Sequence, residues 1–140
     1  MNTNPDRSAE GFSGEVVQAY TRRQAIEDGV LVDLMQSDTI EAVKEAGFKF
    51  PVAMSIGAFS STICEIGKEL PAGQDIQGRL WDVLWMFTVA IRGRQRDADR
   101  VEFAERVWNG DRHNIVKLWS FCGPGDSGEP VITIMLEGED

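Results

Sequence analysis

The sequence predicts an α+β fold in which three to four helices pack on one face of a mainly antiparallel sheet that ends in a C-terminal meander. Three observations support this prediction. Apolar residues recur at helical spacing through the first two-thirds of the chain, and after residue 100 they alternate with polar residues as in half-buried strands. Between two of the alternating runs lies Asn109-Gly110, a dipeptide that tolerates the positive φ of a tight hairpin turn.

The chain has 140 residues, of which 42% are hydrophobic, and this suffices for one core but not for two. Residues 1–14 are polar and aperiodic and predict a disordered arm, whereas residues 15–140 predict a single α+β domain. The first twenty residues lack the apolar stretch of a secretory signal. The longest apolar run, 83–91, is too short to cross a bilayer, so we expect a cytoplasmic protein without a membrane partner.

The first ordered elements are a short helix and a short strand. Thr21 and Gln24 have the spacing of a capping box, and Gly29 favours a helix end, so a helix is predicted over 22–28. The apolar residues 30–32 follow directly and predict a strand.

A second helix and a second strand come next. Ser37 and Asp38 are both candidate N-caps for this helix, and Gly47 ends it. Apolar residues alternate over 48–54, which predicts a strand. Pro51 has no N–H to donate to a sheet, so it requires a sheet edge or the start of a strand.

Two further helices are predicted before residue 93. Ser55 begins one helix that extends to about residue 67, and Asp75 caps the other over 76–92. Apolar residues cover more than half of the circumference of this last helix. A helix of that kind is normally packed on two sides.

The last forty residues predict strands over 100–108, 115–121 and 131–136. The glycine-rich loop 123–128 separates the second of these strands from the third. We expect the two early strands to join the same sheet and the helix 76–92 to form the layer that covers it.

The surface charge limits the classes of partner. Lys and Arg total 14, Asp and Glu total 23, and the formal net charge is −9, so direct nucleic-acid binding is disfavoured. The local exception is the stretch 92–106, where Arg92, Arg94 and Arg96 offer a nucleic-acid contact as an alternative function. Because acids interleave with these arginines, a solvated turn with internal ion pairs is the favoured interpretation.

Residue types that carry metal or nucleophile chemistry are scarce. His113 is the single histidine, so no metal or cofactor is expected. Cys64 and Cys122 are distant in sequence and are expected to be reduced thiols, with a disulfide between them as the alternative. The tetrapeptide 125–128 resembles a serine-protease nucleophile motif, but it lacks an oriented base. The favoured interpretation is a tight connection in which Asp126 bonds its own turn backbone.

Asp82 is the one acid inside the apolar helix. If it points inward it needs a partner, and Arg79 or a backbone amide is the candidate. Trp81 and Trp85 flank it at helical spacing and are expected in the core, with an aromatic ledge for a ligand as the alternative. A small enzyme or small-molecule binder would have its site beside this helix and the loop 123–128, and that function stays open.

Three segments together resemble one uncharacterised bacterial family of small proteins that are often encoded on plasmids and other mobile elements. The segments are YTRRQAIEDGVLVD, GRLWDVLWM and CGPGDSGEPVITIML, in that order, and the resemblance covers about residues 20–140. The chain departs from the family over 93–113, and Glu137 stands where the family usually has Pro. The resemblance implies a bacterial cytoplasm and a gene on horizontally moving DNA, and it assigns no catalytic residue.

These observations favour a non-catalytic accessory protein of a mobile element that acts by binding another protein. One specific version is a counter-defence inhibitor whose negative charge occupies a nucleic-acid channel. Edge strands and numerous aromatic residues are also compatible with a homodimer.

Overall fold

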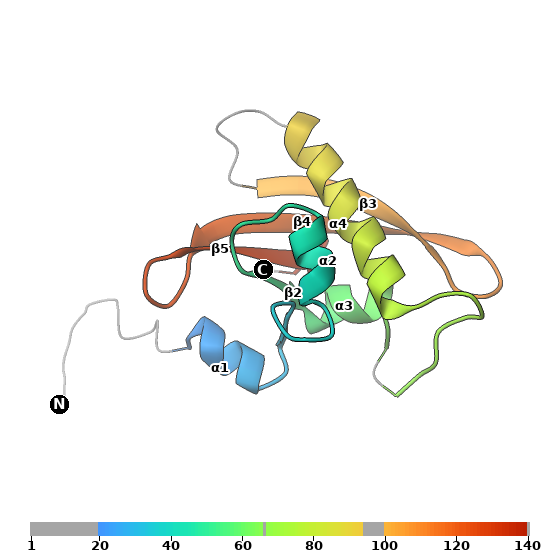
Figure 1. Ribbon diagram of the computed structural model, residues 1–140, viewed down its shortest axis with the longest axis horizontal. Helices are drawn as coiled ribbons and strands as arrows, with labels where there is room; N and C mark the ends of the chain where they lie inside the picture. The colour runs from blue at the N-terminus through green and yellow to red at the C-terminus, as the bar shows by residue number, and fades with distance from the viewer. Residues whose placement is uncertain (1–19, 66, 94–99, 140) are drawn as a thin grey trace.

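The structure is a computed structural model that describes residues 20–65, 67–93 and 100–139, and it has the α+β class that the sequence predicts (Figure 1). The arm predicted over residues 1–14 lies outside the described residues, and the single-domain organisation stays a prediction. The elements, in chain order, are α1 (Arg22–Glu27), β1 (Leu31–Asp33), α2 (Ile40–Glu45), β2 (Val52–Ser55), α3 (Ile56–Thr62), α4 (Ile76–Gly93), β3 (Arg100–Trp108), β4 (His113–Pro124) and β5 (Pro130–Leu136).

The five strands form one mixed sheet in the order β1-β2-β5-β4-β3. The last three strands are consecutive antiparallel neighbours, which confirms the C-terminal meander. The early strands join the same sheet because β2 pairs with β5, and this one pairing is parallel, with Val52 opposite Ile132.

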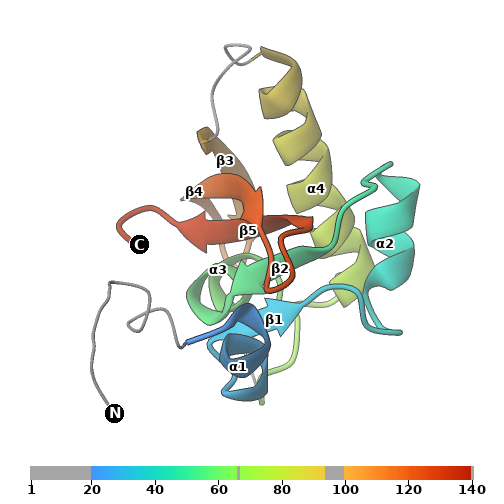
Figure 2. The same ribbon diagram turned by 90° about the vertical axis from the view of Figure 1, so that its left-hand side faces the viewer.

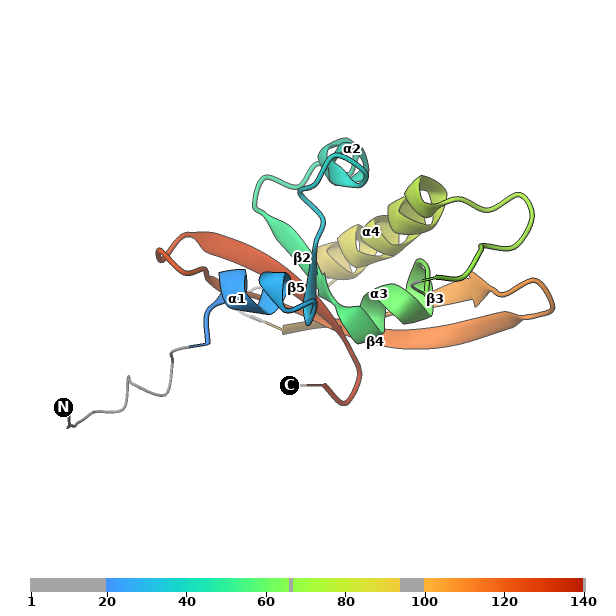
Figure 3. The same ribbon diagram turned by 90° about the horizontal axis from the view of Figure 1, so that it is seen from below.

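The two faces of the sheet are covered differently. Helices α2 and α4 lie together on one side, and the C-terminal tail lies on the other side (Figures 2 and 3). Because side chains alternate along a strand, each strand contributes one row to the helix-covered side and one row to the opposite side, which we call the open face. Of the helices that the structure describes, none is long and apolar enough to span a membrane.

Packing of α4 on the sheet forms the centre of the core. Leu80, Val83, Leu84 and Phe87 are the buried residues of this helix. The Phe87 ring stacks against both Phe48 and Phe103, with 5.3 Å between ring centroids in each pair. An aromatic ring of the helix is thereby held between the segment before β2 and the strand β3.

Strand β2 is buried along its whole length because it lies between β1 and β5. It begins at Val52, later than the predicted residue 48. Pro51 therefore lies just before the strand, and its carbonyl accepts a hydrogen bond from the Ile132 N–H at 2.9 Å. Pro51, which has no N–H to donate, thus lies at the start of a strand and not at the edge of the sheet.

Three helix starts show the predicted capping. Thr21 and Gln24 form both hydrogen bonds of the capping box, and the Ser55 hydroxyl accepts from the Ala58 N–H. The Asp75 carboxylate accepts from the Gly78 N–H at 2.6 Å at the start of α4.

The starting residue predicted for α2 and the end predicted for α3 are wrong. Thr39, and neither Ser37 nor Asp38, is the N-cap residue of α2, and its hydroxyl instead donates to the Leu34 carbonyl at 2.7 Å. Helix α3 ends at Thr62, several residues early. It ends there because the Ile63 and Cys64 N–H groups share the Phe59 carbonyl, which closes the last turn.

The loop between β4 and β5 holds α1 in place. The Asp126 carboxylate accepts from the backbone N–H of Arg22 at 2.9 Å and of Arg23 at 3.0 Å, more than one hundred residues earlier in the chain. The expectation that Asp126 bonds its own turn is wrong, because Glu129 bonds the turn instead through the Ser127 N–H. A carboxylate from the C-terminal hairpin thus satisfies the free N–H groups of the first helix.

The variant Asp126→Ala should lower the free energy of unfolding at neutral pH. The N–H groups of Arg22 and Arg23 hold the pKa of the Asp126 carboxyl below its usual range. The stabilisation is therefore complete above the usual pKa of an aspartate and is lost as the pH falls through the depressed pKa. Urea unfolding of the wild type and of Asp126→Ala at a series of pH values measures this loss of stability, with Ser127→Ala as the matched control. A difference between the two proteins that persists unchanged in acid would contradict the role of this carboxylate.

Candidate functional site

The outer side of α4 exposes an apolar ridge. Trp81 is 38% exposed, Trp85 45%, Met86 38% and Val89 44%, and we call these four residues the α4 ridge. The expectation that Trp81 and Trp85 lie in the core is wrong. Helix α4 packs on α2, α3 and the sheet with one side only, so the apolar residues beyond that side face outward.

The two tryptophans of the ridge are stacked on each other. Their ring centroids are 5.9 Å apart with an interplanar angle of 27°, as their spacing of one helical turn allows. The Arg92 guanidinium lies 5.8 Å from the centroid of the Trp85 ring. Exposed tryptophans beside an arginine are the residue types that contribute most to protein–protein binding.

Asp82 is exposed and so does not require the partner that an inward position would need. Arg79 bonds to other groups. Its guanidinium donates to the Ile63 carbonyl at 3.0 Å, to the Trp108 carbonyl and to the Gln74 side chain. Arg79 therefore joins the start of α4 to the end of α3 and to the β3–β4 hairpin, and its role is structural.

The charged neighbour of Asp82 is Glu105 on β3, which was not among the residues predicted for a site. Glu105 is only 7% exposed, because it lies in the inward row of β3 with Phe103 and Val107. Burial raises the pKa of Glu105 to about 7, and the charge of Asp82 adds to this effect. Burial also raises the pKa of Asp82. The ion pairs formed within residues 20–65, 67–93 and 100–139 do not involve Glu105.

A hollow of about 350 Å³ lies beside Glu105. It is lined by Met86, Ala104, Glu105, Arg106 and Ile115. Asp82, Trp81 and Trp85 do not line this hollow.

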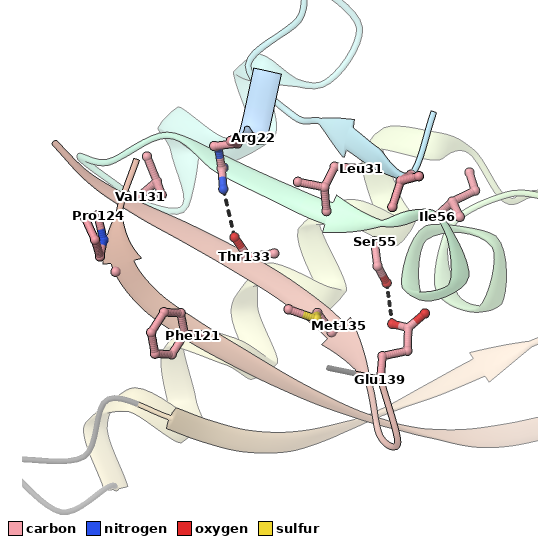
Figure 4. Close-up of a pocket in the computed structure, with 12 residues that line it drawn as sticks. Arg22, Leu31, Ser55, Ile56, Phe121, Pro124, Val131, Thr133, Met135 and Glu139 are labelled. Atoms are coloured by element: carbon pink, nitrogen blue, oxygen red, sulfur yellow. Dashed lines mark hydrogen bonds between the residues drawn. The ribbon is translucent and has the colours of Figure 1, made fainter. Parts of the chain in front are cut away.

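The two halves of the predicted small-molecule site are on opposite faces of the sheet. A close-up of the open face shows α4 behind the strands, whereas Gly123 and Pro124, the first residues of the predicted loop, lie at the end of β4 (Figure 4). The loop itself does contribute to a cavity on the open face, but α4 cannot reach that cavity through the sheet.

This open-face cavity has a volume of about 580 Å³. It lies over β5 and is bordered by α1, by the start of α3 and by the C-terminal tail (Figure 4). The walls are mainly apolar and include Leu31, Ile56, Phe121, Val131 and Met135. The sequence signal for these walls was the alternation along the strands, which did not indicate which face would stay uncovered.

Four polar side chains line the cavity. The Arg22 guanidinium donates to the Thr133 hydroxyl at 2.8 Å and to the Ile132 carbonyl at 3.2 Å. Burial lowers the pKa of Arg22, and nearby acids offset part of this effect. At the other side of the cavity the Ser55 hydroxyl donates to Glu139 Oε1 at 2.6 Å.

The arginines of the stretch 92–106 do not meet in one described patch. Arg94 and Arg96 lie outside the described residues, and Arg92 lies over Trp85. The Arg100 guanidinium lies 3.9 Å from the centroid of the Trp119 ring and pairs with Glu102 at 3.3 Å. Arg92 and Arg100 thus each lie against an aromatic ring, and Arg100 also pairs with an acid.

The residue types of metal and nucleophile chemistry are also dispersed. His113 begins β4 and its ring packs beside Trp108, with 5.0 Å between ring centroids. Cys64 and Cys122 are free thiols. Within the part of the chain that the structure describes, no three residues of the types His, Cys, Asp and Glu form a group that could hold a metal ion.

The fold and the open-face cavity define a small α+β protein whose sheet is covered by helices on one face and is open on the other. The chain belongs to DUF6573, a family of unknown function that matches residues 10–140. The resemblance seen in the sequence is thereby confirmed at the level of an uncharacterised family. No curated protein and no solved structure matches the chain.

The variant Glu105→Gln should stabilise the protein at and above neutral pH. The raised pKa means that ionisation of Glu105 costs folding free energy as the pH rises from about 4.5 to about 7. One pKa unit corresponds to about 1.4 kcal/mol, so we expect a gain of roughly 3 to 4 kcal/mol above that range and little change below it.

Chemical unfolding of the wild type and of Glu105→Gln, at pH values from mildly acidic to mildly basic, measures the difference between their free energies of unfolding. Glu102→Gln on the same strand is the control, because Glu102 is exposed and pairs with Arg100, so it should change stability by no more than about 1 kcal/mol. An equal effect of Glu105→Gln at every pH would show that the carboxyl does not titrate in the folded protein.

Proposed function

We propose that this protein is a non-catalytic accessory protein that binds another protein through the α4 ridge. The observation that carries the proposal is the exposure of two stacked tryptophans on a helix whose other side is buried. Burying such rings in an interface is strongly favourable, and tryptophan is enriched among the residues that dominate binding energy.

The charged residues beside the α4 ridge indicate what kind of partner surface would fit it. Asp82 is exposed beside Trp81, and Arg92 lies over Trp85, so a complementary surface offers an apolar groove with a cation near Asp82. A net charge of −9 favours a basic partner and speeds its encounter with this protein. We therefore expect a protein with an apolar groove and a basic rim.

The resemblance to proteins encoded on mobile elements gives this proposal its biological setting. An accessory protein of a plasmid acts within a bacterial cell, so the partner is a host protein. The sharper version is a host defence protein with a basic nucleic-acid channel, whose binding to this acidic protein weakens with added salt. Nucleic acid itself is not the proposed partner, because the acidic surface repels phosphates.

The test compares three tagged full-length baits in a bacterial extract. The wild type and Phe121→Ala should capture the same protein, and the double variant Trp81→Ala/Trp85→Ala should bind it roughly thirtyfold more weakly or lose it. Phe121 is the matched control because it is an aromatic residue of similar exposure, 43%, on the open face. Thermal unfolding of each bait establishes that all three are folded.

Two outcomes would overturn the proposal. Capture that survives the double tryptophan variant but fails with Phe121→Ala would place binding on the open face. A concentration-dependent dimer that the double variant abolishes, without capture of any host protein, would assign the ridge to a second copy of this chain.

A further inference from the structure

The open-face cavity has the composition of a small-molecule site. Its volume of about 580 Å³ lies within the range of about 300 to 1,000 Å³ that is typical of ligand pockets. Apolar side chains from three strands and from α3 form most of its wall, among them Leu31, Ile56, Phe121 and Met135. A few polar groups among apolar walls are what orients a bound ligand.

Arg22 supplies the positive charge of this cavity. It is half-buried, and its guanidinium points from the first turn of α1 toward β5 (Figure 4). The contacts with Thr133 and the Ile132 carbonyl use two of its five N–H groups. These contacts fix the plane of the guanidinium beside the cavity, and a planar guanidinium held in this way is suited to a carboxylate.

The acids near Arg22 are bonded to other donors. Asp33, Asp126 and Glu129 are close enough to favour the charged form of Arg22. Their carboxylates nevertheless accept from N–H groups other than those of the Arg22 guanidinium. These donors are Met35 and Gln36 for Asp33, the backbone N–H groups of Arg22 and Arg23 for Asp126, and Ser127 for Glu129. They lower the cost of burying the cation and do not form a direct pair with its guanidinium in the described structure.

The far side of the cavity carries the opposite charge. The Ser55 hydroxyl and the Leu136 N–H both donate to Glu139 Oε1, at 2.6 Å and 2.8 Å. The Glu139 carboxylate is thereby held at the cavity wall, where it disfavours a second anionic group. A ligand with one negative charge at one end and an apolar body fits this distribution of charge.

We propose that the open-face cavity binds a small monocarboxylic acid with an apolar body, whose carboxylate pairs with Arg22. The carboxylate lies at the α1 side of the cavity, and the apolar body lies over Leu31, Val131 and Met135. This site is on the opposite side of the sheet from the α4 ridge, so it is independent of the proposed protein binding.

Calorimetric titration of the full-length protein with octanoate, octanol and octylamine tests the chemical class. Octanoate should bind at least tenfold more tightly than octanol, and octylammonium should bind most weakly, because only the acid pairs with Arg22. The methyl signals of Leu31, Ile56 and Val131 should shift on binding, while those of Val89 on α4 should not. No octanoate binding, equal binding of acid and alcohol, a preference for the amine, or shifts centred on Val89 would each overturn the proposal.

Variants locate the interaction with the carboxylate. Arg22→Met should weaken octanoate binding about tenfold or more and leave octanol binding unchanged, whereas Arg22→Lys should retain the preference for the acid. Glu139→Gln keeps an oxygen that can accept from Ser55 and should strengthen octanoate binding, because it removes a negative charge. Unchanged octanoate affinity in Arg22→Met would overturn the proposal. If that variant does not fold, a loss of the acid preference in Glu139→Gln would overturn it instead.

Discussion

The stack of Phe87 between Phe48 and Phe103 sets the rotation of α4 about its own axis. Once Phe87 points into the core, Leu80 and Leu84 follow it inward, because residues three and four apart share a face of a helix. The same periodicity turns Trp81 and Trp85 away from the sheet. The exposed tryptophans are therefore a consequence of how the core is packed and not a local irregularity.

The sheet separates the molecule into two surfaces that cannot share a ligand. Each strand offers alternate side chains to the two faces, so neighbours in sequence such as Ile132 and Thr133 belong to different environments. On one side α4 presents aromatic rings on a convex helix. On the other side, residues from both ends of the chain surround a cavity, with Arg22 from the beginning and Glu139 from the end. A convex aromatic surface suits a protein partner, and a cavity suits a small molecule.

Local signals in the sequence predict the elements well, because the physics that creates them is local. The capping box at Thr21, the cap at Asp75 and the hairpin at Asn109-Gly110 all act within a few residues. Long-range features were not predictable in the same way. The apolar residues around α4 do not indicate whether the helix is packed on one side or on two. Nothing in the sequence near Asp126 indicates that its hydrogen-bond partners are at residues 22 and 23. Glu105 could have been recognised, because it occupies an inward position in an otherwise apolar row.

The hydrogen bonds between Asp126 and the start of α1 have a consequence for synthesis on the ribosome. Helix α1 has six residues, too few to persist alone in water, and the carboxylate that holds it is made more than one hundred residues later. The pairing of β2 with β5 also waits for the last strand to be made. The open face, together with its cavity, therefore takes shape only after β5 and the residues up to Glu139 have emerged.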